Sequence, residues 1–445
     1  MRSDTAGTLC RRRGTARVPS RSWPRAALTG FAPWPGHRAP REAPAAPRWI
    51  SRIEAATPPH RDRAIDGIRA LAIAGVVLGH FLVMALVVQG GGGLRVASPL
   101  VHLPGLAPAS WVLQMLGLFF LVGGYAAALS WNKADAYGPW VRARLLRLGR
   151  PVVASTALLG AAIPVLAVAG VSPVTLRTTA VLVVQPLWFI GVYMAITALT
   201  PLAVAMVRRL GIAAVVPSLV IVAGVDLLRY GPWHDAMPGW VGLVNVLPGW
   251  AFGYLLGVAW ARGHVTRRVA GVLAAGGLAL ALLLVLRLGY PVSMVGVPGA
   301  GRANSHPPSL LVLALAAAQS GVVILARDRI EALLRRRPAL WAGVAVTNLS
   351  AMTIFCWHQI ALMLLSGVTL ALAPSGLPGL HDTPGSLTWV ACRLGWLVLH
   401  LVVLGGLVAA ARRFEAPWTA APRTVRYAAL ALAAVFAGYC AIVVW

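Results

Sequence analysis

After Arg63, three further ionisable side chains stand at helical spacing in Arg63–Phe81, the first long apolar stretch of this 445-residue chain. Asp66 and Arg69 open the stretch, and His80 follows eleven residues after Arg69. Eleven residues of α-helix rise about 16 Å and make three turns plus roughly 20°, so Arg69 and His80 share one face, with Asp66 near it. If this helix crosses a membrane, it carries a fixed cation at one boundary and a proton acceptor deep inside. Ionisable groups within a span are costly and by default indicate function.

A second interpretation of the pair stays open. His80 would only hydrogen-bond a neighbouring helix, and Arg69 would extend to lipid headgroups. The helix also carries small residues that leave space beside the pair: Ala70, Ala72, Ala74, Gly75 and Gly79. The pair at this spacing therefore favours a functional role.

The composition identifies the class of protein that positions these groups. Hydrophobic residues make up 58% of the chain and charged residues only 11%, whereas a soluble domain is about one quarter charged. This excludes ordinary cytosolic enzymes, nucleic-acid binders and disordered scaffolds. The four cysteines have no metal-ligand spacing, and no disulfide framework is implied.

Apolar windows of membrane length recur along the chain. The sequence therefore predicts an all-α, polytopic membrane bundle of ten to eleven spans. We expect them at about 66–88, 110–130, 151–171, 187–207, 211–228, 240–260, 269–287, 309–326, 344–365, 387–410 and 427–445.

The basic residues predict the orientation of these spans. The net charge is +27, and Lys133 is the only lysine; this bias towards arginine suggests a GC-rich bacterial genome. Most loop arginines fall on the side of the N-terminus, and the exceptions are few: Arg95, Arg177, Arg229, Arg287 and Arg302. Positively charged loops remain in the cytosol, so we expect a multi-pass protein of the cytoplasmic membrane with a cytosolic N-terminus. No nucleic-acid partner is expected, because these charges mark a membrane face.

Three regions are expected along the chain. Residues 1–60 are rich in Arg and Pro and are predicted to be a disordered cytosolic tail, unless they lie upstream of the true start codon or form a basic arm on anionic lipid. Residues 61–410 form the membrane domain, and 411–445 add a C-terminal transmembrane helix. Because the chain ends in this span, we expect no soluble domain after it.

Several motifs resemble a known family, the membrane acyltransferase-3 family of integral-membrane O-acyltransferases. The family's mark is Asp-Gly-(Leu/Ile)-Arg-Ala in the first span, with His eleven residues after the Arg, and here these residues are Asp66–Ala70 and His80. Supporting motifs are found at Leu118–Tyr125, Val141–Pro151, Pro186–Phe189 and Phe355–Gln359. The first of these departs from the family pattern at Gly123, where Ser is usual.

The resemblance implies transfer of an acyl group, for example acetyl, from acyl-CoA to a hydroxyl of a glycan, lipid or natural product. A hydroxyl needs a base at neutral pH, and histidine, with an ordinary pKa near 6.5, is suited to this and contributes about 10²–10⁴-fold. We therefore expect His80 and Arg69 to be catalytic. Acyl-CoA is expected as donor substrate, with a cell-envelope glycan or secondary metabolite as acceptor, and no metal or permanently bound cofactor.

The candidates for substrate binding are Asp66, Arg144, Arg147, Arg150, Trp188 and His358. The three arginines between the second and third spans would clamp the phosphates of CoA, although positive-inside topology alone also explains them. Trp188 would stack against a sugar or simply anchor the interface. His358 would assist proton transfer, bind substrate or only pack, whereas His400 is expected to be structural.

A proton-coupled transporter or exporter that uses His80 and His358 is the alternative function. Many transporters contain paired half-repeats. The later half of this chain has no second Asp-Gly-x-Arg and no second Arg-to-His spacing, which favours the transferase.

Overall fold

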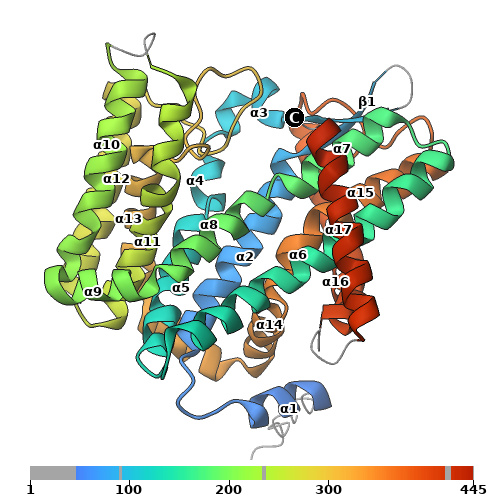
Figure 1. The fold of residues 1–445 in the computed structure, drawn as a ribbon. Helices are drawn as coiled ribbons and strands as arrows, with labels where there is room; N and C mark the ends of the chain where they lie inside the picture. The colour runs from blue at the N-terminus through green and yellow to red at the C-terminus, as the bar shows by residue number, and fades with distance from the viewer. Residues whose placement is uncertain (1–46, 90–92, 233–236, 416–421, 444–445) are drawn as a thin grey trace, which may run out of the picture. The chain divides into compact units, whose positions relative to one another are not determined.

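A computed structural model describes residues 47–89, 93–232, 237–415 and 422–443 (Figure 1). The predicted tail lies largely outside these residues. The described chain is almost wholly helical, with α1 (Arg48–Ala56), α2 (Arg63–Val83), α3 (Pro99–His102), α4 (Ala109–Leu113), α5 (Leu116–Trp131), α6 (Tyr137–Val168), α7 (Pro173–Val184), α8 (Leu187–Ala198) and α9 (Thr200–Leu210). It continues with α10 (Val216–Tyr230), α11 (Val246–Ala261), α12 (Arg267–Leu288), α13 (Leu310–Arg336), α14 (Pro338–Leu349), α15 (Ala351–Leu372), α16 (Leu387–Glu415) and α17 (Arg423–Val443). Short 3₁₀ helices are η1 (Pro104–Leu106), η2 (Gly211–Val215) and η4 (Gly239–Asn245).

Eleven helical segments within the described residues are long and apolar enough to cross a membrane. This confirms the predicted all-α bundle. The fourth segment differs from its expected position at 187–207, because it extends over Pro173–Ala198 and consists of α7 followed by α8. Ser172 caps α7 through the backbone amide of Thr175, and the chain breaks at Pro186, which cannot donate a helical hydrogen bond. Trp188 therefore lies within a span and not at its mouth.

Hydrogen bonds between loops distinguish the two ends of the bundle. At one end, Arg262 contacts Asn132, and Arg267 contacts Asp328. We call this the arginine-rich end; it includes the start of α2, the end of α13 and α14. At the other end the antiparallel strands β1 (Ala85–Gln89) and β2 (Gly93–Ala97) follow α2, with Ala85 opposite Ala97. We call this the hairpin end, and Figure 1 shows β1 and α3 there, opposite α9 and α14.

The first span is fixed at both of its ends. The Asp62 side chain accepts from the amide of Ile65 and caps the start of α2, as short polar side chains do at helix N-termini. α2 ends at Val83, because the chain turns into β1. Between these ends, α2 packs against α5, α13, α14 and α15, so its buried face is enclosed by protein.

Glycines allow several helices to approach closely. A Cβ atom on Gly124 of α5 would lie 2.0 Å from the carbonyl oxygen of Tyr254 in α11. A Cβ atom on Gly277 of α12 would lie 2.6 Å from the carbonyl oxygen of Ala314 in α13. Small residues at such crossings are typical of membrane bundles, where helices associate by close van der Waals packing.

Helix α1 lies inside the segment predicted to be a tail. It packs against α14. Glu54 accepts a hydrogen bond of 2.6 Å from Arg63, and the Arg63 guanidinium lies 4.7 Å from the ring centre of Trp341. These contacts order residues 48–56 at the arginine-rich end, a packing that the tail's polar composition did not indicate.

Candidate active site

A histidine of the first span pairs with a histidine of the ninth. α2 and α15 are in contact, and Nδ1 of His80 lies 2.7 Å from Nε2 of His358. The two rings are stacked, with centroids 4.9 Å apart and planes 14° from parallel. His358 is almost fully buried, at 1% exposure, whereas His80 is half-buried.

The remaining nitrogen of His358 determines where the protons lie. His358 Nδ1 is 2.7 Å from the carbonyl oxygen of Phe355. A carbonyl oxygen only accepts, so Nδ1 carries hydrogen and Nε2 of a neutral His358 is an acceptor. His80 Nδ1 must donate to that acceptor, which leaves His80 Nε2 with a lone pair. This is the state that a general base requires.

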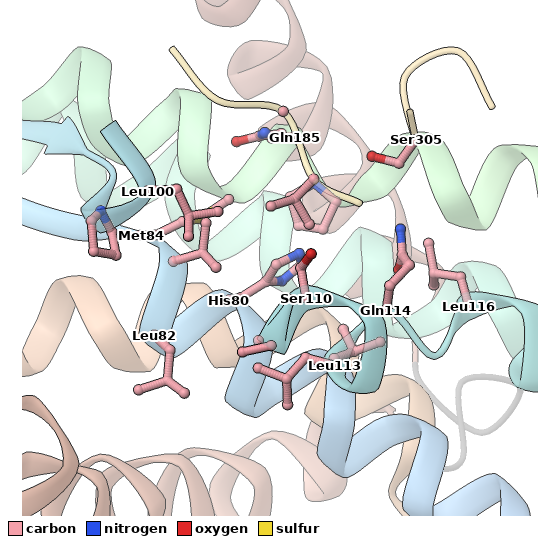
Figure 2. A pocket seen from close by; sticks show the side chains of 18 of the residues that line it. His80, Leu82, Met84, Leu100, Ser110, Leu113, Gln114, Leu116, Gln185 and Ser305 are labelled. Carbon is pink, nitrogen blue, oxygen red and sulfur yellow. The ribbon is translucent and has the colours of Figure 1, made fainter. Parts of the chain in front are cut away.

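His80 lines a cavity of about 370 Å³ towards the hairpin end (Figure 2). Cavities of about 300–1,000 Å³ commonly bind small molecules. The walls come from the end of α2, from α3, α4, the start of α8, the loop 289–309 and the start of α16. Figure 2 shows Met84 and Leu100 on one side of His80, and Gln114 and Leu116 on the other.

A buried carboxylate holds the loop 289–309 over this cavity. Asp226 of α10 accepts hydrogen bonds from the Tyr290 hydroxyl at 3.0 Å, the Leu310 amide at 2.7 Å and the Asn245 side chain at 3.2 Å. The ion pair with Arg229, three residues later on the same helix, is the longest of its contacts, at 3.8 Å. Asp226 therefore joins α10, η4, the loop and the start of α13, and the ion pair is a minor part of its role.

The other side of the loop is tied to α4. The amide of Met294 donates to Ser110 Oγ at 2.9 Å, and Trp111 Nε1 donates to the carbonyl oxygen of Val292 at 2.7 Å. Asn304 cross-links the loop internally. These bonds give the cavity a defined roof.

Trp188 and His306 meet beneath this roof. Their rings are edge-to-face at 4.6 Å between centroids, and both line the cavity. His306 Nδ1 lies 2.9 Å from Ser305 Oγ. Desolvation lowers the pKa of the His306 imidazole below its ordinary value, so the ring is neutral at pH 7.

A second cluster lies at the arginine-rich end. Asp66 accepts two hydrogen bonds from Arg61, at 2.5 and 2.9 Å, and lies 3.5 Å from Arg69. The bond to Asp66 raises the pKa of Arg61 above its ordinary value. The Tyr193 hydroxyl group and Arg147 also lie in the neighbourhood of Arg69. One carboxylate is thus shared among several guanidinium groups, and the cluster keeps a positive charge.

Tyr193 connects this cluster to the second span. The guanidinium groups of Arg69, Arg144 and Arg147 all lie in the neighbourhood of the Tyr193 hydroxyl group. A Cβ atom on Gly123 would lie 2.5 Å from the Tyr193 hydroxyl oxygen. The tyrosine hydroxyl therefore fills the space that a side chain at position 123 would need.

Arg144 and Arg150, the other arginines predicted to bind substrate, have few polar contacts with the rest of the cluster. Arg144 donates to Ser130 Oγ and stacks on Trp140, with its guanidinium 4.9 Å from the ring centre. Arg150 lies one helical turn beyond Arg147 on α6, and its Nε atom is buried without a hydrogen-bond partner among the described residues. The described residues contain no group of three or more His, Cys, Asp or Glu arranged to bind a metal ion.

Sequence reasoning assigned no role to one further residue beside His80. Arg393 of α16 is fully buried and donates to the carbonyl oxygens of Phe81 at 2.9 Å and Met84 at 2.8 Å. It also lies 4.2 Å from the ring centre of Phe81. The sequence did contain a signal for Arg393, because an arginine inside an apolar span rarely lacks a partner and often indicates function.

Comparison with known proteins identifies the family. A family model described as an acyltransferase domain, acyltransferase 3, matches residues 62–392. No curated protein and no solved structure matches the chain. The matched residues include the histidine pair, the residues that line the cavity, and the arginine cluster apart from Arg61, which immediately precedes the match. The chain therefore belongs to the acyltransferase-3 family and is an integral-membrane acyltransferase.

Proposed function

We propose that the protein transfers an acyl group from acyl-CoA to a hydroxyl group of an acceptor, with His80 as general base. The observation that carries this proposal is the hydrogen bond between His80 and His358, which leaves Nε2 unprotonated in a histidine that lines the cavity. In the reaction, the acceptor hydroxyl gives its proton to Nε2 while its oxygen attacks the thioester carbonyl carbon. The C–S bond then breaks, and the leaving thiolate takes the proton from His80, so that an ester and free CoA are formed.

The arginine cluster supports a role in donor binding. Coenzyme A carries phosphates, and guanidinium groups bind phosphate through paired hydrogen bonds. Arg69, Arg144 and Arg147 share one electrostatic environment around Tyr193, with Arg150 on the same helix, and Asp66 orients Arg69. Arg69 and His80 are eleven residues apart on one continuous helix, or about 16 Å. The extended pantetheine arm would connect these two positions.

The arginine distribution supports a cytosolic N-terminus in the cytoplasmic membrane. Acyl-CoA is made in the cytosol and would bind at the arginine-rich end, and the acceptor would enter from the hairpin end. The two histidines would also permit proton-coupled transport, but membership of an acyltransferase family favours transfer.

Thermal stabilisation of the detergent-purified protein tests donor binding without a known acceptor. A ligand that binds the folded state raises stability by RT ln(1 + [L]/Kd). We expect CoA and a series of acyl-CoAs to raise the Tm of wild type. The Arg69→Ala variant should need an about tenfold or higher ligand concentration for the same rise in Tm. Arg95→Ala, an exposed arginine at the hairpin end, should respond like wild type. No response from folded wild-type protein across all chain lengths would refute the donor assignment.

Loss of the base tests the catalytic assignment. His80→Ala should abolish acyl transfer, measured as release of CoA thiol, while acyl-CoA still raises its Tm. His102→Ala, an exposed histidine of α3 outside the cavity, is the matched control and should keep full activity. Unchanged transfer by His80→Ala would refute the mechanism.

A further inference from the structure

The cavity at His80 has walls that indicate the chemistry of the acceptor. We propose that it binds an uncharged, predominantly apolar alcohol that presents one or a few hydroxyl groups, rather than a glycan. The inference rests on the proposed function in one respect, namely that the alcohol in the cavity is the acceptor of the acyl group. Its ligand class follows from the cavity itself.

The location of the cavity assigns it to the acceptor. His80 lines it, and the lone pair on Nε2 is the group that must meet the hydroxyl proton. A proton transfer requires about 2.6–3.2 Å between the two heavy atoms. The reacting hydroxyl must therefore lie inside this cavity.

Charge recognition is absent from the walls. Among the described residues that line the cavity there is no Asp, Glu, Lys or Arg, and the His306 ring is neutral at pH 7. Transferring an ionised ligand from water into such surroundings costs far more than its contacts return. An acidic, phosphorylated or cationic acceptor is therefore disfavoured.

Few polar groups are available to replace water around a sugar. The Ser110 hydroxyl already donates to the carbonyl oxygen of Ala107 at 2.5 Å and accepts from Met294. Ser305 is paired with His306. The polar side-chain groups that remain are the amides of Gln114 and Gln185, the indole N–H groups of Trp188 and Trp389, and Nε2 of His306. A sugar carries a hydroxyl on most of its carbons, and each hydroxyl that is buried without a partner costs about 1–3 kcal/mol.

Apolar side chains form the rest of the surface near His80, among them Met84, Leu100, Leu113, Phe189 and Phe355. Each buried CH₂ of a ligand contributes about 0.8 kcal/mol against such walls. In Figure 2, Gln185 and Ser305 lie at one end of the view and Leu82 and Leu113 at the other. The ligand that fits is an apolar body with a small polar end, and the acyl chain of a donor has no such polar end.

Two matched pairs of variants test the ligand class in the purified full chain. Leu100 faces the cavity and is 6% exposed, whereas its neighbour Val101 is 47% exposed on the same short helix. Leu113 lines the cavity, and its neighbour Val112 is 65% exposed. We compare Leu100→Asn with Val101→Asn and Leu113→Asn with Val112→Asn, after confirming that each elutes as a folded species.

The ligands are menthol as a free apolar alcohol, dioctanoylglycerol as a lipid alcohol and methyl glucoside as a sugar. We expect menthol, dioctanoylglycerol or both to raise the Tm of wild type saturably. The cavity variants should need about tenfold more ligand, because a polar group replaces apolar contact, and the two control variants should match wild type. Menthol and dioctanoylglycerol distinguish a free compound from a membrane lipid as the source of the alcohol.

Stabilisation by methyl glucoside alone, stabilisation by no alcohol, or equal effects in cavity and control variants would each overturn the proposal. A titration with acyl-CoAs on the same samples separates this result from the proposed function. Binding of alcohols without binding of acyl-CoA would refute the transferase mechanism and leave the ligand class standing. Weaker binding of long-chain acyl-CoA in the cavity variants, without any binding of alcohols, would assign the cavity to the donor's acyl chain instead.

Discussion

At the scale of single residues, the pairing of two neutral histidines distinguishes this site from one in which a carboxylate orients the base. His358 receives no ion pair from the described residues; its orientation comes from the carbonyl oxygen of Phe355. That contact selects the tautomer of His358, and through it the tautomer of His80. In the proposed mechanism His358 is a positioning residue that acts through His80.

Replacement of His358 should separate orientation from packing. His358→Leu keeps an apolar body but removes the acceptor for His80 Nδ1, and we expect kcat to fall about 10- to 100-fold with KM for acyl-CoA nearly unchanged, because the base loses its fixed tautomer. His358→Gln offers a carbonyl oxygen and should recover part of this loss. Steady-state kinetics of the two variants provide the measurement, and equal activity of both with wild type would remove the role of the pair.

At the scale of elements, Arg393 holds the end of the helix that carries His80. The last carbonyl groups of a helix have no partner within it, and here the guanidinium group of α16 binds those of Phe81 and Met84. It also donates to the carbonyl oxygen of Gly379 at 3.4 Å. The end of α2, the loop 373–386 that precedes α16, and α16 itself are thereby fixed to one another.

Arg393→Met should therefore both destabilise the protein and misplace His80. Carbonyl groups left without a partner cost about 1–3 kcal/mol each, so we expect a loss of about 3 kcal/mol in stability and a kcat reduced about tenfold or more, with little change in KM for acyl-CoA. Arg177→Met, an exposed arginine on α7, serves as the control. A variant with normal Tm and normal kcat would contradict this account of α2.

The crossing of α12 and α13 allows a second test at this scale. Gly277→Ala would place a Cβ atom 2.6 Å from backbone atoms of Ala314 and Ala318, whereas Gly276→Ala meets no atom within 4 Å. Because backbone cannot rotate away, the helices must separate, and we expect Gly277→Ala to cost about 1–3 kcal/mol. Gly276→Ala should be neutral or slightly stabilising, since Ala favours the helix by about 1 kcal/mol over Gly. Unfolding in mixed micelles measures the difference, and equal stability of the two variants would be the contrary result.

At the scale of the whole molecule, the chemistry is divided between the two ends of the bundle. The arginine cluster lies at one end and the apolar cavity at the other, with α2 connecting them. This division matches a donor made in the cytosol and an acceptor that enters from the opposite side. The match between the two ends and the two substrates requires that the arginine-rich end faces the cytosol.

Labelling of single cysteines tests this orientation. In a variant without the native cysteines, we introduce Ala300→Cys in the loop 289–309 and His264→Cys between α11 and α12; both residues are exposed. A membrane-impermeant maleimide added to intact cells should label position 300 and should label position 264 only after the cells are opened. The reverse pattern would place the arginine cluster outside and remove its access to cytosolic CoA.

The sequence by itself determined the membrane class and the number of spans, and it pointed to Arg69 and His80 as candidates for the site. The length of each apolar segment and the placement of arginines in the loops are local properties of the sequence. They determine insertion and orientation without any contact between helices. The spacing from Arg69 to His80 likewise belongs to one helix, so it could be read from the chain directly. Even the error at the fourth span has a local cause, because Pro186 resembles a boundary although both of its neighbouring helices belong to one span.

Only the tertiary structure decided which groups from distant spans meet. The bond between His80 and His358 joins residues 278 positions apart, and the contact of Arg393 with Phe81 joins residues 312 positions apart. In an all-helical membrane domain, hydropathy shows that a face is buried but not which helix covers it, because many apolar surfaces are interchangeable in lipid. The tautomer of His80, the cavity and its apolar walls all depend on that choice of neighbours, and so they became visible only in the packed bundle.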